Sequence, residues 1–174
     1  NIAFRNDSAQ MNINGELDAI AHLQMTNTGE LNSYLRFSQT PINIGNLQLS
    51  FLPATVTNQG NRTTISNFGF LAGRGRMYNR YLGIDGAISE QPQDTLNISF
   101  ENARLAYILR SFDINNISAT VDGDIKLTQL LQQPEVYTDN LRIADIIIFG
   151  DTLGVLDVRS NFTQRQGAVN YNAT

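Results

Sequence analysis

The sequence predicts an all-β fold, and three observations lead to this prediction. Apolar and polar residues alternate with a period of two along most of the chain, and turn residues recur at regular spacing. The polarity comes largely from uncharged amides, with 20 Asn and 12 Gln among 174 residues. Because 41% of the residues are hydrophobic and only 16% are charged, a disordered acidic tail or a charged coiled coil does not fit the composition.

The first long alternation lies between Met11 and Met25. Its odd positions are apolar except for Gly15, and only Ile20 interrupts the polar even positions. This period fits a strand with one wet face and fits a helix poorly. An unbroken strand of this length would span about 50 Å, so we expect either a turn near Asn14-Gly15 or an unusually broad sheet.

The same alternation continues towards Pro53 and returns in later segments, with turns expected around Asn27-Thr28-Gly29, Ile44-Gly45-Asn46 and Asn58-Gln59-Gly60-Asn61. Later strands are expected at Thr63–Ala72, Leu82–Ser89, Leu96–Phe100, Ala119–Leu127, Asn140–Phe149, Thr152–Phe162 and Ala168–Tyr171. The segment Ala103–Phe112 differs, because Leu105, Ile108, Leu109 and Phe112 recur at helical spacing. We expect one short helix there, laid across the sheet.

The alternation does not determine whether the sheet closes on itself. A two-sheet sandwich, an eight-stranded barrel and an elongated open sheet each have one dry and one wet face, so all three produce the same pattern. We therefore expect about ten strands joined as hairpins without choosing among these architectures from the pattern.

Charge and composition exclude several partners and chemistries. The net charge of −4 and a pI near 4.8 argue against nucleic acid as a partner. The longest apolar run, Ile146–Phe149, is far shorter than a spanning helix requires. The chain has no Cys, which excludes disulfides and cysteine-ligated metals. Because it opens at Asn1 without a leader, we interpret it as a piece of a longer protein.

Candidate chemical motifs favour ordinary surface roles. His22 lies in the polar row of its strand, and no Gly-x-Ser-x-Gly accompanies it, so we expect a solvated residue rather than part of a triad. The pair in Asp122-Gly123-Asp124 lacks the further acceptors of a calcium loop and is expected on a wet face. Arg74, Arg76 and Arg80, interleaved with Met77, Tyr78 and Tyr81, are expected on an exposed strand and loop. We predict neither an enzyme nor a cofactor or metal site.

Two stretches carry a family resemblance. From Leu47 to Ser89 the chain has Leu52-Pro53, Asn67-Phe68 and the strand LGIDGAIS, and from Asp94 to Ile146 a strand and short helix precede a second strand, a spacer and Pro134. Together they resemble the C-terminal region of the TamB family, the translocation and assembly module proteins of the AsmA-like superfamily, as found in Bacteroidetes-type bacteria. The chain departs from that family at Gln129-Leu130, where the family tends to have Gly-Thr.

The resemblance implies an elongated, curled, taco-like antiparallel or mixed β-sheet with an apolar inner face and one short helix. It implies that residues 1–174 form one segment of a larger repetitive periplasmic protein, with possible sub-repeats at 1–90 and 91–174. Such proteins are anchored in the inner membrane through an upstream helix and reach an outer-membrane partner of the Omp85 class. They are linked to phospholipid transport and to assembly of outer-membrane proteins.

We expect the inner face to be a hydrophobic trough that holds lipid acyl chains or apolar β-strands, at about 0.8 kcal/mol for each buried CH₂. The alternation assigns eleven residues to this trough: Leu17, Leu23, Leu96, Ile98, Phe100, Ile125, Leu127, Leu141, Ile143, Leu156 and Val158. The rival hypothesis is a secreted adhesin or carbohydrate-binding β-sandwich, which the absence of Trp weakens. A small outer-membrane barrel fits badly because aromatic girdles are missing.

Overall fold

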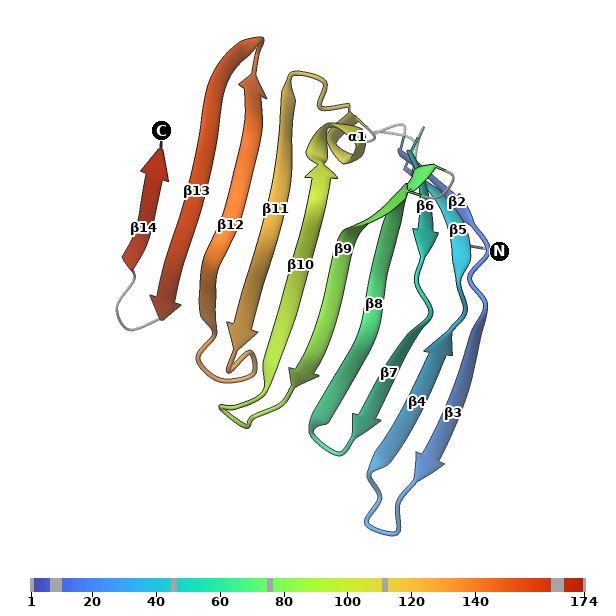
Figure 1. The fold of residues 1–174 in the computed structure, drawn as a ribbon. Coiled ribbons are helices and arrows are strands. Elements are labelled where there is room, and N and C mark those ends of the chain that lie inside the picture. The colour runs from blue at the N-terminus through green and yellow to red at the C-terminus, as the bar shows by residue number, and fades with distance from the viewer. Residues whose placement is uncertain are drawn as a thin grey trace.

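The computed structural model describes residues 2–6, 11–44, 47–74, 77–110, 113–163 and 168–173, which form one antiparallel sheet and one short helix (Figure 1). The strands are β1 (Ile2–Asn6), β2 (Met11–Gly15), β3 (Ala19–Met25), β4 (Leu31–Phe37), β5 (Thr40–Ile44), β6 (Leu47–Phe51), β7 (Ala54–Gln59), β8 (Arg62–Arg74), β9 (Met77–Ile88), β10 (Thr95–Arg104), β11 (Ile117–Thr128), β12 (Glu135–Ile148), β13 (Asp151–Thr163) and β14 (Ala168–Ala173). The helix α1 covers Leu105–Arg110. The predicted curled all-β fold is therefore confirmed.

The sheet branches at β8. From β8 to β14 the strands pair in chain order, as successive hairpins. On its other side β8 pairs with two strands at once: Arg62–Ser66 lie beside β7, and Phe70–Ala72 lie beside β6. One branch continues through β7, β4 and β3, and the other through β6, β5, β2 and β1. The sheet stays open, with β14 and the two branches at opposite ends (Figure 1), so the β-sandwich considered above does not form.

A seam of strand breaks separates the two branches. Three chain segments each run through both branches and break between them, at Glu16–Asp18, Ser38–Gln39 and Leu52–Pro53. Pro53 has no N–H to donate to a sheet ladder, which accounts for the break in its segment. The expected strand over Met11–Met25 is thus two strands, β2 and β3, and they do not form a hairpin because neither pairs with the other.

Bulges bend the longer strands instead of breaking them. In β8 the register with β9 shifts between Ile65 and Phe68, and in β10 the register with β11 shifts between Phe100 and Ala103. Each bulge contains an Asn at positive φ, 56° at Asn67 and 49° at Asn102, a conformation that Asn tolerates better than most residues. A bulge increases local twist, so this repeated feature contributes to the curl of the sheet.

Each of these bulges faces an Asp-Gly pair on the neighbouring strand. The N–H of Asn67 donates to Asp85, and the N–H of Asn102 donates to Asp122. The following glycines, Gly86 and Gly123, have φ of 131° and 115°. A Cβ at Gly123 would lie 2.2 Å from the carbonyl oxygen of Asn140, so glycine is required there for β11 to approach β12.

Most of the expected elements are present, and two strands are additional. Helix α1 lies within the expected segment 103–112, although residues 111 and 112 are outside the described part of the chain. The structure contains strands β1 and β7, which the pattern does not predict. Turns form at Gly29 and Gly60 as expected, whereas the expected turn at Gly45-Asn46 lies outside the described residues.

Candidate functional site

The candidate site is the apolar face of the sheet, which register partners define residue by residue. Directly opposed residues in antiparallel strands point to the same side. One continuous row crosses eight strands: Ala21, Leu35, Val56, Ile65, Gly86, Leu96, Leu127 and Val136. Every member of this row except Gly86 has an apolar side chain, so the row forms a hydrophobic band that only a glycine interrupts. We call the side of the sheet that carries this row the apolar face.

Further rows extend the apolar face along the strands. Phe68, Ile84, Ile98 and Ile125 are successive partners from β8 to β11. Ala103, Val121, Ile143 and Leu156 are successive partners from β10 to β13, although bulges lie between these rows. A bulge therefore adds a residue to the chain while the apolar side chains on both sides of it keep the same face.

Four phenylalanines form the densest part of the apolar face, beside the seam. The ring of Phe51 has its centroid 5.7 Å from that of Phe37, 5.1 Å from that of Phe68 and 5.4 Å from that of Phe70. All three contacts are edge-to-face, the arrangement that ring quadrupoles favour. Phe51 is only 2% exposed, so this cluster anchors the junction of β4, β6 and β8.

Helix α1 packs at one end of the apolar face. Its Leu105 and Ile108 lie against a buried cluster of Leu49, Tyr81, Ala103 and Val121. The helix lies beside the ends of β10 and β11 in Figure 1 and covers only that end of the sheet. The part of the apolar face farther from α1 is not covered by any other helix among the described residues.

The position of Tyr81 corrects a sequence expectation. The pattern predicts an exposed strand here, but Tyr81 is 5% exposed, and its hydroxyl donates a hydrogen bond to the carbonyl oxygen of Arg104. Burial raises the pKa of Tyr81 to about 12, with a further contribution from Tyr107. Arg80 forms an ion pair with Asp85 at 2.6 Å. The side chains of the other residues in the basic segment, 74–78, are outside the part of the chain that the structure describes.

Nine of the eleven predicted trough residues lie on the apolar face of four adjacent strands, β10 to β13. Four direct pairs bring eight of them together: Leu96 with Leu127, Ile98 with Ile125, Leu141 with Val158, and Ile143 with Leu156. Phe100 lies opposite Gly123 on the same face. Leu96 is buried, and the other eight are half-buried. That these nine residues line a trough for cargo stays a prediction.

The two remaining predicted residues lie apart from this group. Leu17 falls in the seam between β2 and β3, and it is half-buried rather than placed on a strand. Leu23 lies on β3 and is 67% exposed. The sequence prediction also misses apolar-face residues on other strands, including Val56 and Ile65. Their signal is present, because Ala54 and Val56 alternate with threonines, but the preceding Pro53 suggests the end of a strand.

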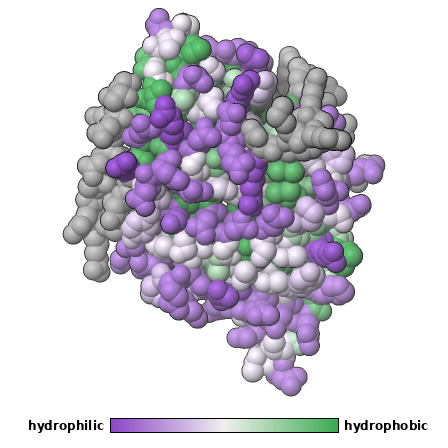
Figure 2. All heavy atoms as spheres, in the orientation of Figure 1, coloured by the Kyte–Doolittle hydropathy of each residue, from purple (hydrophilic) through white to green (hydrophobic). Residues whose placement is uncertain are grey.

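The opposite face of the sheet is polar. Asp85, Asn97 and Lys126 are successive partners there, and so are Asp122, Arg142 and Asp157. The side of the molecule turned to the viewer in Figure 2 is mostly hydrophilic, with smaller hydrophobic patches, one of which lies near the tip of the β12–β13 hairpin. The protein therefore has two chemically different sides on a single sheet.

The carboxylates singled out in the sequence bond to protein groups on this polar face. Asp122 accepts the N–H of Asn102, and Asp124 accepts from the side-chain amide of Asn140 at 3.0 Å. His22 is exposed, with its ring centroid 6.1 Å from that of Tyr34. Within the described ranges, no three His, Asp or Glu side chains gather in a group that could hold a metal ion.

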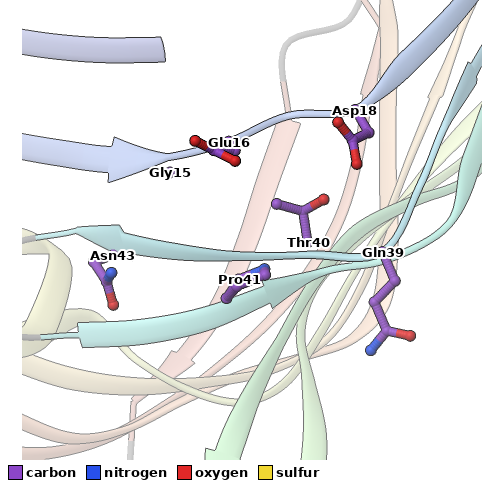
Figure 3. Close-up of a pocket in the computed structure, with 7 residues that line it drawn as sticks. All are labelled: Gly15, Glu16, Asp18, Gln39, Thr40, Pro41 and Asn43. Atoms are coloured by element: carbon purple, nitrogen blue, oxygen red, sulfur yellow. The ribbon is translucent and has the colours of Figure 1, made fainter. Parts of the chain in front are cut away.

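A polar hollow of about 490 Å³ opens at the seam (Figure 3). It is lined by Gly15, Glu16, Asp18, Gln39, Thr40, Pro41 and Asn43. In Figure 3, Asp18 and Thr40 face the gap between the two chain segments, whereas Gln39 points away from it. The carboxylates of Glu16 and Asp18 are both exposed, and the lining contains no Lys or Arg. An acidic, open hollow suits apolar cargo poorly, so we place the candidate site on the apolar face.

Neither a protein-family model, nor a curated protein, nor a solved structure matches the chain. In the described part of the chain no helix has the length and apolar character to span a membrane. The geometry itself defines the class of protein: a single open, curled antiparallel sheet with one apolar and one polar face.

Proposed function

We propose that the apolar face holds lipid acyl chains, and that the chain is a segment of a TamB-like, AsmA-like periplasmic protein that guides phospholipid between the inner and outer membranes. Assembly of outer-membrane proteins is the second activity that the resemblance implies, with an apolar β-strand in place of the acyl chain. An outer-membrane protein of the Omp85 class is the partner in this proposal.

The observation that carries this proposal is the apolar row across eight strands in a sheet that stays open. Monomeric soluble proteins rarely leave contiguous apolar surfaces without a ligand or partner. Each CH₂ group that moves from water onto such a surface contributes about 0.8 kcal/mol, so an acyl chain gains several kcal/mol without any polar anchor. Contacts of this kind are non-directional, which suits a cargo that slides along the sheet.

A photo-crosslinking comparison tests the proposal on neighbouring positions of one strand. A photoreactive residue at Ile125 lies on the apolar face, whereas one at Lys126 is exposed on the polar face. The two variants are incubated with vesicles of phosphatidylethanolamine and phosphatidylglycerol, and phospholipid adducts are measured by mass spectrometry. We expect adducts at position 125 and few at position 126.

Two outcomes contradict the proposal, provided that circular dichroism shows both variants to be folded. Equal adduct yields at the two positions indicate non-specific contact with the vesicle. Absence of adducts at both positions removes acyl chains as the cargo. Native mass spectrometry of the freshly purified protein is the complementary measurement, since we expect phospholipid to remain bound to it.

A further inference from the structure

The apolar face is unevenly covered, and helix α1 accounts for the difference. Beside the helix, Tyr81, Ala103 and Val121 are only 1–6% exposed, and Leu105 and Ile108 of the helix pack against the cluster that they form with Leu49. The partly buried side chains that also pack against this cluster include Phe70, Ala72, Phe100, Leu141 and Ile143. We call the surface made by the cluster and these side chains the α1 half of the apolar face.

The remainder of the apolar face lies farther from the helix, and we call it the open half. It consists of the row from Leu35 to Val136 and the row from Phe68 to Ile125. None of these residues belongs to the described cluster beside α1, and all of the apolar ones except Leu96 are half-buried. Strands β8 to β12 each have a neighbour on both sides, so this partial exposure belongs to the face of the sheet and not to an edge.

We propose that acyl chains bind in the open half alone, and that α1 is the barrier that keeps them out of the α1 half. This inference rests on the function proposed above and adds where on the face the cargo lies. In the α1 half the apolar side chains already have apolar neighbours, so a cargo gains little by displacing them. In the open half the half-buried side chains leave water only when a cargo covers them.

The open half has room for a hydrocarbon chain. The row from Leu35 to Val136 crosses seven strands, which at about 4.8 Å between strands corresponds to about 29 Å along the sheet. A bilayer core of about 30 Å contains two layers of acyl chains, so one chain measures about 15 Å. One chain therefore fits with space to shift along the row, which is the movement that a guiding surface requires.

The chemistry of a sheet face favours hydrocarbon over a peptide strand as the occupant. The backbone N–H and C=O groups of β8 to β12 form the ladders between neighbouring strands. A peptide strand laid on this face finds few free backbone partners, and each of its own groups that is buried without a partner costs free energy. An acyl chain has no such groups, so the open half suits it better.

Hydrogen bonds hold α1 in place at both ends. The hydroxyl of Tyr81 donates to the carbonyl oxygen of Arg104, the residue directly before the helix. The N–H of Ile114 donates to the carbonyl oxygen of Leu109, at 3.0 Å, and so closes the last turn. Because Tyr81 lies on β9, the first of these bonds joins the start of α1 to the sheet. Loosening α1 should therefore open the α1 half to cargo.

Two isoleucines on adjacent strands form a matched pair for the test. Both are half-buried, but Ile125 lies in the open half, whereas Ile143 lies in the α1 half. A photoreactive residue replaces one or the other, and the folded variants are incubated with vesicles of phosphatidylethanolamine and phosphatidylglycerol. We expect about tenfold more phospholipid adducts at position 125 than at position 143, the factor that corresponds to about two CH₂ groups left without apolar contact.

Variants of the helix test the barrier itself. Leu105→Ala combined with Ile108→Ala removes the side chains that pack against the sheet, and we expect adducts at position 143 to rise to the yield at position 125. Tyr81→Phe, which removes only the hydrogen bond to Arg104, should raise them in the same direction and replaces the double variant if that one does not fold. Arg110→Ala changes an exposed position of the same helix and is the control, for which we expect no rise.

The outcomes separate this inference from the function on which it rests. Equal adduct yields at positions 125 and 143 with α1 unmodified, or an unchanged yield at position 143 in the helix variants, would overturn the proposed division of the face while acyl binding stands. Absence of adducts at both positions would overturn the proposed function, and this inference with it.

Discussion

Two regions of the sheet carry the same alternation but differ in how their strands are built. Residues 11–59 form strands of five to seven residues that break at the seam, whereas residues 62–163 form strands of 10–14 residues that continue through bulges. In the long-strand region the predicted trough residues are buried or half-buried, whereas in the short-strand region every residue of β3 is exposed. Alternation therefore determines which face a side chain takes, and neighbouring strands determine how far it is buried.

The largest expected effect concerns two phenylalanines, one in each region. Phe51 is 2% exposed at the seam, and Phe149 is 77% exposed in the turn between β12 and β13. We expect Phe51→Ala to lower the free energy of unfolding by about 3–5 kcal/mol, because the aromatic cluster loses its central ring. Phe149→Ala should change it by less than about 0.5 kcal/mol. Chemical denaturation measures both, and a large loss for Phe149→Ala would contradict the burial argument.

The second comparison is between two Gly→Ala substitutions, one where long strands pack closely and one in an open turn. Gly123 in β11 and Gly29 in the β3–β4 turn both have positive φ, 115° and 84°, but an added Cβ meets backbone atoms only at Gly123. Gly123→Ala should therefore cost about 2–4 kcal/mol, from backbone strain together with separation of β11 from β12. Gly29→Ala should cost about 1 kcal/mol from strain alone. Equal losses in denaturant unfolding would show that strand approach contributes nothing at Gly123.

A charged substitution on the apolar face should destabilise the long-strand region more than the short-strand region. Ile125 is half-buried in β11, whereas Leu23 is 67% exposed on β3. Ile125→Asp should lower stability by about 2–3 kcal/mol because the carboxylate is partly desolvated. Leu23→Asp should stay within about 0.5 kcal/mol of the unmodified chain, because this side chain is exposed. Thermal unfolding of the two variants makes the comparison, and a reversed order would contradict the assignment of the half-buried and exposed regions.

The smallest expected effect is a pH dependence in the long-strand region. Hydrogen bonds from Arg62, at 2.8 Å, and from Ser89, at 2.6 Å, lower the pKa of Asp94 to about 2 from its ordinary value of 3.8. Because the folded-state pKa is the lower one, this carboxylate contributes stability above pH 4, and the contribution is lost as the pH falls from about 4 to about 2.

The control for this pH dependence is Arg62→Gln, which removes the main cause of the shift while Ser89 remains. The acid-induced loss of stability should become smaller in the variant. Unfolding midpoints measured across this pH range test the expectation, and identical pH profiles for the two proteins would assign the acid sensitivity to other carboxylates.

Much of the fold is predictable because it depends on local alternation. Runs of apolar residues at every second position indicate the strands over residues 62–163, and Leu105, Ile108 and Leu109 at helical spacing indicate α1. Strand β7 escapes prediction because Pro53 resembles a terminus, although the chain resumes pairing at Ala54. Of the candidate site, the predicted residues on β10 to β13 can be assigned to one face, but alternation does not reveal their neighbours.

The all-β class, the short helix and the face that each strand residue takes follow from the amino-acid order, since side-chain direction alternates within a single strand. The branching of the sheet at β8, the alignment of three breaks into a seam and the burial of Tyr81 emerge only in the folded chain. These features depend on which strands pair. Pairing is settled by hydrogen bonds and apolar contacts between residues far apart in the chain, which a local period of two cannot encode.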